Sequence, residues 1–113
     1  MDKQLTFSFD FDNNISKDPL TFLGIMQFIQ DMGHKAIVCT CRLPTTEPED
    51  LDFLVKRGYE VIFTSHVGKK KYLRSIGIEV DIWIDDCAES ILEDWNGAAR
   101  TFREMENGYE CVA

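Results

Sequence analysis

The stretch TFSFDFDNNIS, residues 6–16, carries the clearest indication of the fold. It opens within an apolar run, Leu5–Phe9, which is typical of a buried β-strand. Two acids one residue apart, Asp10 and Asp12, follow this run directly. The pattern therefore predicts a strand that is followed by two carboxylates. The rest of the sequence indicates which residues lie near them.

Three further apolar runs, rich in Val, Ile and Phe, predict three more strands. They cover Ala36–Cys39, Tyr59–Phe63 and Val80–Ile84. Each run is too short to show a helical period, and β-branched residues favour strands. Because the runs are almost continuously apolar, we expect strands that are buried on both faces, as in a parallel sheet.

Helical signals fill the intervals between these runs. Asp18 and Pro19 form a favourable helix start, and glycines follow three of the periodic segments. The expected helices run from Pro19 to Gly33, from Pro48 to Gly58, from Lys69 to Ile76 with Gly77 after it, from about Ala88 through Trp95, and over Ala98–Met105. Strands and helices thus alternate along the chain.

This alternation predicts an α/β fold in one domain spanning residues 1–113. We expect a three-layer, Rossmann-like parallel sheet with right-handed crossovers and helices on both faces. Ligands of such sheets bind outside the carboxyl ends of the strands. The residues just after each strand are therefore the first place to look for a site.

Composition narrows the classes of partner. A formal net charge of −8 opposes binding to long nucleic acid, which depends on neutralising phosphates, but it permits a small anionic substrate. No apolar run is long enough to span a bilayer. The four cysteines, Cys39, Cys41, Cys87 and Cys111, do not have the pattern of a disulfide framework. We therefore expect a cytoplasmic protein without a membrane segment.

Chemically active side chains follow all four predicted strands. They are Asp10 and Asp12 after the first, Thr40 after the second, Lys69–Lys71 after the third, and Asp85 and Asp86 after the fourth. Carboxylates gathered at one place stay ionised only when a cation offsets them, and oxygen ligands of this kind suit Mg²⁺. A hydroxyl and an ammonium supply a donor and a point charge for a phosphoryl group. The set predicts metal-assisted phosphoryl chemistry.

Each of these features has an ordinary structural explanation when taken alone. Asp-x-Asp and Asp-Asp pairs frequently form turns and helix caps, and a lysine run usually lies in water. The acidic residues Glu47, Glu49, Asp50 and Asp52 are expected to form a solvated helix start. The functional explanation gains its strength from the occurrence of suitable residues at four successive strand ends.

In this order, the acid pair, the threonine, the lysine and the Asp-Asp pair resemble the four motifs of the haloacid dehalogenase (HAD) superfamily. The resemblance runs from Phe7 to Asp86, and VDIWIDDCAESI, residues 80–91, is similar to the last motif of its small phosphatases. The intervals leave no room for a cap domain, which implies a minimal core with an open site. An open site suits an exposed substrate or closure by a partner subunit, as in a homodimer.

The resemblance implies specific roles for the carboxylates. Asp10 would be the nucleophile that forms an aspartyl-phosphate, and Asp12 would protonate the leaving oxygen and then activate water. Mg²⁺ would be bound by Asp10, by the backbone carbonyl of Asp12 and by Asp86. Asp85 would support the metal through water or orient the lysine.

The resemblance also assigns the substrate contacts. Thr40 and one lysine would hold the phosphoryl oxygens; Lys69 is favoured, and Lys70 and Lys71 stay open. Arg42, in a Thr-x-Arg pattern, resembles a substrate-binding arginine of nucleotidase and polynucleotide-phosphatase relatives. The implied activity is an Mg²⁺-dependent phosphomonoester hydrolase, or phosphatase. A nucleotide is slightly favoured as its substrate, and a polynucleotide 3′-phosphate and a sugar phosphate stay open.

Two departures keep an alternative open. Asn13 and Asn14 stand where the superfamily usually has Gly and then Thr or Val. Asn13 can replace Gly because asparagine tolerates positive φ, whereas Asn14 is less usual. The alternative is a catalytically weak or inactive module that binds a phosphorylated ligand or nucleotide as a sensor or sequestering protein. A receiver domain, which also uses Asp, Thr and Lys, is disfavoured by the order of the acid pairs.

Overall fold

The computed structural model describes residues 3–43 and 48–94, and its centre is a four-stranded sheet. The strands are β1 (Thr6–Phe9), β2 (Lys35–Thr40), β3 (Glu60–Phe63) and β4 (Ile82–Ile84). All the strand pairs are parallel, and the strand order is β3-β2-β1-β4. The predicted strands are confirmed, with boundaries shifted by one or two residues.

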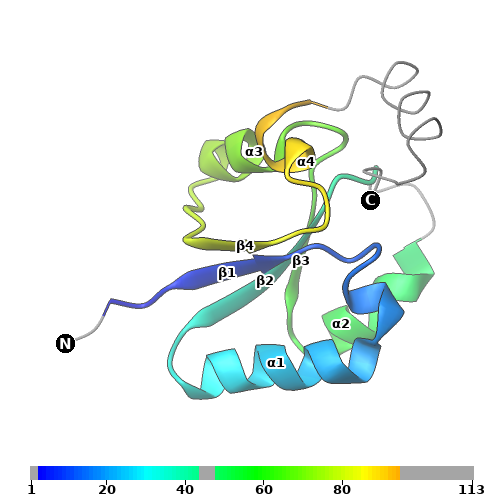
Figure 1. Cartoon of the computed structure of the whole chain (residues 1–113), viewed down its shortest axis with the longest axis vertical. Helices are drawn as coiled ribbons and strands as arrows, with labels where there is room; N and C mark the ends of the chain where they lie inside the picture. Colours follow the sequence, from blue (N-terminus) through cyan, green and yellow to red (C-terminus); the bar gives the residue numbers. More distant parts are fainter. Residues whose placement is uncertain (1–2, 44–47, 95–113) are drawn as a thin grey trace.

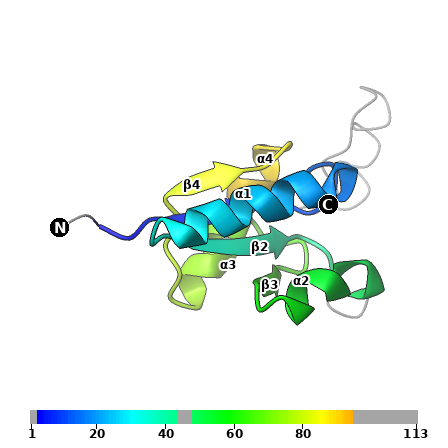
Figure 2. The same ribbon diagram turned by 90° about the horizontal axis from the view of Figure 1, so that it is seen from below.

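Helices cover both faces of this sheet. They are α1 (Pro19–Asp31), α2 (Asp52–Lys56), α3 (Lys69–Ser75) and α4 (Glu89–Leu92), with 3₁₀ turns η1 (Ile15–Lys17) and η2 (Pro48–Leu51). α1 and α2 lie on one face, and α3 and α4 lie on the other (Figure 1). Figure 2 shows α1 running along the sheet with α3 behind it. The predicted α/β fold with a parallel sheet between two helical layers is confirmed and is compatible with a Rossmann-like fold.

The signals that predicted the helix ends act as expected. The Asp18 carboxylate accepts hydrogen bonds from the backbone N–H and the hydroxyl of Thr21, at 3.2 and 2.7 Å. Gly33, Gly58 and Gly77 have φ values of 91°, 88° and 86°. Glycine adopts this left-handed conformation at no steric cost, so each can end its helix and turn the chain back to the sheet.

Two helix predictions need correction. The second helix begins as the 3₁₀ turn η2 and becomes α-helical only at Asp52, where no side chain caps the first turn. The fourth helix spans only Glu89–Leu92, and Glu93 is extended. Trp95 and the stretch predicted as a helix over 98–105 lie outside the described residues.

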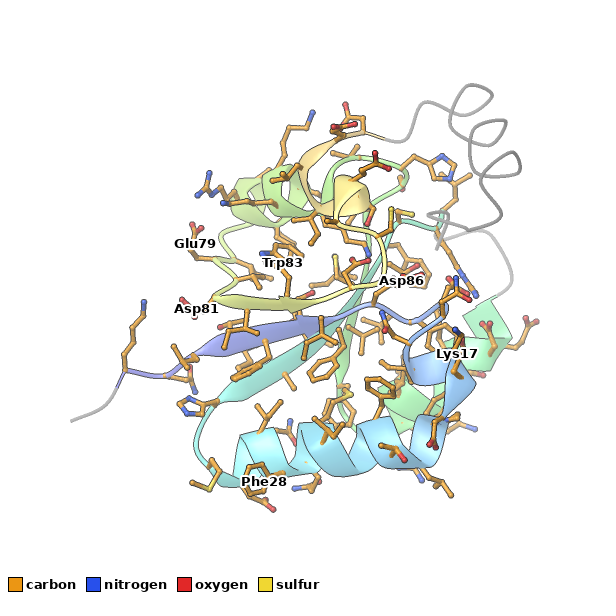
Figure 3. The ribbon with its side chains drawn as sticks, in the orientation of Figure 1. Lys17, Phe28, Glu79, Asp81, Trp83 and Asp86 are labelled. Atoms are coloured by element: carbon orange, nitrogen blue, oxygen red, sulfur yellow. The ribbon has the colours of Figure 1, made fainter. Side chains whose placement is uncertain are left out.

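The two faces of the sheet carry two separate apolar clusters. Because successive strand residues point to opposite faces, Val38 packs toward α1 and α2, whereas Ile37 and Cys39 pack toward α3. Trp83 projects from β4 on the α3 side (Figure 3) and joins the second cluster as a packing residue, as predicted. The strands are thereby fixed between two layers, and their carboxyl ends are held at one edge.

Two of the four cysteines, Cys39 and Cys41, are free and buried. Cys111 lies outside the described residues. Within the described residues, no helix is long and apolar enough to cross a membrane.

Candidate active site

The sheet register brings the ends of β1 and β4 together. Phe9 pairs with Ile84, so the acids that follow each strand, Asp10 and Asp85, leave the sheet side by side. The backbone N–H of Asp10 donates to the carbonyl of Ile84 at 2.9 Å, which extends the ladder by one residue. The predicted meeting of these strand ends is therefore a consequence of parallel pairing.

Three carboxylates form a compact cluster at this edge. One oxygen from each of Asp10, Asp85 and Asp86 lies within 4.8 Å of the others. Asp10 is buried at 2% exposure, Asp85 is partly buried and Asp86 is exposed at the end of β4 (Figure 3). The cluster therefore extends from the protein interior to the solvent. Its carboxylate oxygens could hold a metal ion.

Lys69, the first residue of α3, reaches into this cluster. Its ammonium is fully buried and lies 3.0 Å from Asp10 Oδ1 and 2.5 Å from Asp85 Oδ2. Lys71 instead pairs with Asp94 in solvent at 3.0 Å. Of the consecutive lysines, Lys69 is thus the one that meets the carboxylates, as favoured from its position at the helix start.

Burial dominates the electrostatics of this group. Burial raises the pKa of Asp10 to about 8; Lys69 opposes the shift and Asp85 adds to it. Burial alone would lower the pKa of Lys69, but Asp10 and Asp85 raise it above its ordinary value. One buried ammonium therefore does not fully compensate the carboxylates around it.

Asp10 also keeps an unused acceptor. Its Oδ2 is buried and has no hydrogen-bond partner among the described residues. A buried polar atom without a partner is costly, so a native site usually supplies one from water, an ion or a substrate. This oxygen, together with the deficit of positive charge, fits a cation at the cluster.

The remaining contacts fix the surroundings of the cluster. Asp85 Oδ1 accepts from the backbone N–H of Cys87 at 2.9 Å, and the hydroxyl of Ser90 lies 3.4 Å from Oδ2. Thr40, at the end of β2, is fully buried, and its hydroxyl oxygen accepts from the N–H of Arg42 at 3.3 Å. Thr40 and Asp85 are thus held in place by the chain that follows them.

Asp12 and Arg42 form a second unit beside the cluster. Asp12 is not among the three clustered carboxylates; its Oδ2 and Oδ1 accept from Arg42 Nε at 3.1 Å and from Nη2 at 2.6 Å. Arg42 also binds Asp50 of η2 through two hydrogen bonds of 2.9 and 3.0 Å. Sequence reasoning placed Asp50 in a solvated helix start and missed this pairing, because no local pattern links residues 12, 42 and 50.

The loop after β1 has the geometry predicted for one of its asparagines. Asn13 has a φ of 65°, so it occupies the left-handed region that glycine usually fills. Asn14 leaves its Nδ2 buried without a partner among the described residues. After β3, Ser65 and His66 also have positive φ, at 55° and 70°. Sequence signals did not predict these two strained residues.

Comparisons of the chain with protein-family models, curated proteins and solved structures find no match. What the site does must therefore be inferred from its own residues.

Proposed function

We propose that the chain is an Mg²⁺-dependent phosphomonoester hydrolase with a minimal, capless HAD-like core. The observation that carries this proposal is the buried carboxylate of Asp10, held 3.0 Å from a buried ammonium and clustered with Asp85 and Asp86. This carboxylate lies at the carboxyl edge of a parallel sheet, where ligands of such folds bind, and one of its oxygens has no hydrogen-bond partner among the described residues. The set of oxygen donors suits Mg²⁺.

In the first step Asp10 would attack phosphorus, forming a bond to the phosphoryl group as the bond to the leaving oxygen breaks. Asp12 would donate its proton to that leaving oxygen. Lys69 and the hydroxyl of Thr40 would hold phosphoryl oxygens on which charge develops. The product of this step would be an aspartyl-phosphate and a free alcohol.

In the second step Asp12, now ionised, would remove a proton from water. The water oxygen would attack phosphorus, the bond to Asp10 would break, and inorganic phosphate would leave. Both carboxylates would return to their starting state, so the cycle needs only water and the ester.

Asp10, Asp86 and the backbone carbonyl of Asp12 would hold the metal, and Asp85 would orient Lys69. When bound, Mg²⁺ would supply positive charge that keeps Asp10 ionised and offsets charge on the transferred group. We propose a small phosphorylated substrate, with nucleotides the first class to test.

A catalytically weak or inactive module is the second candidate. Its support is the Asp12 carboxylate, which is already occupied by Arg42, and the unusual Asn14 beside it. Such a protein would bind a phosphorylated ligand or nucleotide without releasing phosphate. Measurable turnover of the bound ligand would exclude this candidate.

The test is phosphate release from para-nitrophenyl phosphate and a panel of nucleoside monophosphates, with MgCl₂ or with EDTA. We expect Asp10→Asn to lower kcat by at least ~10³-fold, since loss of a nucleophile removes the covalent route. EDTA should also abolish turnover. Asp31→Asn is the control, because Asp31 is an exposed acid at the end of α1. Turnover that survives both Asp10→Asn and EDTA would contradict the proposal.

A further inference from the structure

The guanidinium of Arg42 is held on three sides. Asp12 binds one edge through two hydrogen bonds, and Asp50 binds another edge through two more. The ring of Phe11 lies beneath the guanidinium, 5.4 Å from its central carbon to the ring centroid. Paired carboxylates and an aromatic face are the contacts for which arginine is best suited, and together they fix its orientation.

These contacts use most of the binding capacity of Arg42. A guanidinium has five N–H donors, and hydrogen bonds to the two carboxylates take up four. The side chain is only 19% exposed. Little of it remains to bind a substrate anion, whereas its geometry is well suited to holding the Asp12 carboxylate in one place.

Asp50 joins this unit to the apolar core of the fold. It lies in η2, whose next residue, Leu51, is 1% exposed in the apolar cluster beneath α1 and α2. The chain is therefore anchored in the core at the residue next to Asp50, while the half-exposed Asp50 side chain reaches Arg42. Through Arg42, the core of the domain is connected to the carboxylate of Asp12.

We propose that Asp50 is a positioning residue for the reaction, acting through Arg42 to fix the carboxylate of Asp12. The inference rests on the proposed function, in which Asp12 protonates the leaving oxygen. In this role Arg42 orients the proton donor Asp12. The Thr-x-Arg pattern instead suggests that Arg42 binds the substrate, and the two roles predict different kinetics.

The two roles of Arg42 predict opposite kinetics for Asp50→Asn. If Arg42 positions Asp12, loss of the carboxylate at residue 50 should lower kcat and leave KM unchanged. If Arg42 binds substrate, the variant frees N–H groups for the substrate and should lower KM while kcat is kept. This comparison separates the roles without removing Arg42 itself.

Leaving groups of different basicity sharpen the test. Phenol, the leaving group of phenyl phosphate, has a pKa of about 10, like the tyrosine side chain. Because it is more basic than para-nitrophenol, its departure depends far more on a proton donor. General acid catalysis contributes ~10²–10⁴-fold, so a displaced donor should cost a part of that. The ratio kcat/KM reports the first step, in which the leaving group departs. We expect Asp50→Asn to lower kcat/KM by ~10-fold on phenyl phosphate and by less than ~3-fold on para-nitrophenyl phosphate.

Asp52→Asn is the matched control. Asp52 is exposed, two residues away in α2, so its variant removes the same charge from the same acidic segment. It should behave as wild type on both esters. Equal losses of kcat/KM on the two esters in Asp50→Asn would show a general structural effect and overturn the inference, as would a lower KM with unchanged kcat.

A second measurement reads the geometry directly. In NMR spectra, the Nε–H of Arg42 should exchange slowly with water in the wild type and quickly in Asp50→Asn; fast exchange in the wild type would overturn the inference. A wild type with no turnover on either ester would contradict the proposed function. An active wild type whose kinetics match those of Asp50→Asn would overturn the positioning role alone.

Discussion

Asp10 and Lys69 show what the fold does to single side chains. Both are almost completely removed from water, and each favours the charged form of the other. For Asp10 the balance favours the proton, because burial outweighs the attraction of Lys69. The resulting pKa of about 8 leaves the isolated carboxyl largely neutral near pH 7 and makes its ionisation dependent on a bound cation.

This balance predicts a pH-dependent stability of the metal-free chain. The ordinary pKa of Asp10 is 3.8 and its folded value is about 8, so the folded state keeps the proton that the unfolded state loses. Its stabilising contribution is complete below pH 4 and is lost as pH rises towards 8. The free energy of unfolding of the wild type should therefore fall relative to that of Asp10→Asn over this range, as measured by urea denaturation in EDTA.

The same titration with MgCl₂ supplies the control. A cation favours the ionised carboxylate, so the difference between the two proteins should depend much less on pH. Parallel stability profiles for the wild type and Asp10→Asn in EDTA, from pH 4 to 8, would show that the Asp10 carboxyl is not perturbed.

At the level of elements, the start of α3 depends on close packing against the C-terminal end of α4 and the residue after it. A Cβ placed on Gly68 would lie 3.2 Å from the carbonyl carbon of Leu92 and 3.3 Å from backbone atoms of Glu93. The Gly68 N–H also donates to the Asp94 carboxylate at 2.9 Å. Because backbone atoms cannot rotate aside, the absence of a side chain at Gly68 allows α3 to place Lys69 in the site.

We expect Gly68→Ala to lower the free energy of unfolding by about 1–3 kcal/mol through overpacking. Gly24→Ala is the opposite case, since nothing lies within 4 Å of the added Cβ in the interior of α1. That variant should raise the stability by about 0.5–1 kcal/mol, because alanine is the better helix former. Urea denaturation of both variants checks the pair, and a neutral Gly68→Ala would contradict the packing argument.

The elements also show which structure the sequence could predict. Continuous apolar runs and glycine-terminated periodic segments predicted four strands and most helix limits, because these signals are local. Local patterns did not indicate where α4 ends or that the second helix starts as a 3₁₀ turn. The Asp12–Arg42–Asp50 unit was missed for the same reason, since its members come from three segments that only the folded chain brings together.

At the scale of the whole molecule, the parallel sheet explains why the candidate residues meet. The order β3-β2-β1-β4 places β1 and β2 at the centre, with their carboxyl ends beside those of β4 and β3 (Figure 1). Asp10, Thr40, Lys69 and Asp85 thereby share one edge, as the sequence predicted. Their roles, the metal, a cytoplasmic location and a homodimer stay predictions, since chemistry does not follow from a fold alone.

The central claim is that Asp10 attacks phosphorus, and trapping the intermediate tests it most directly. Wild type turning over para-nitrophenyl phosphate with MgCl₂ is quenched in acid, reduced with borohydride and digested for peptide mass spectrometry. Reduction of an aspartyl-phosphate converts that aspartate to homoserine, and we predict homoserine at residue 10 alone, dependent on substrate. Turnover without modification of residue 10, or with modification of another acid, would contradict the claim.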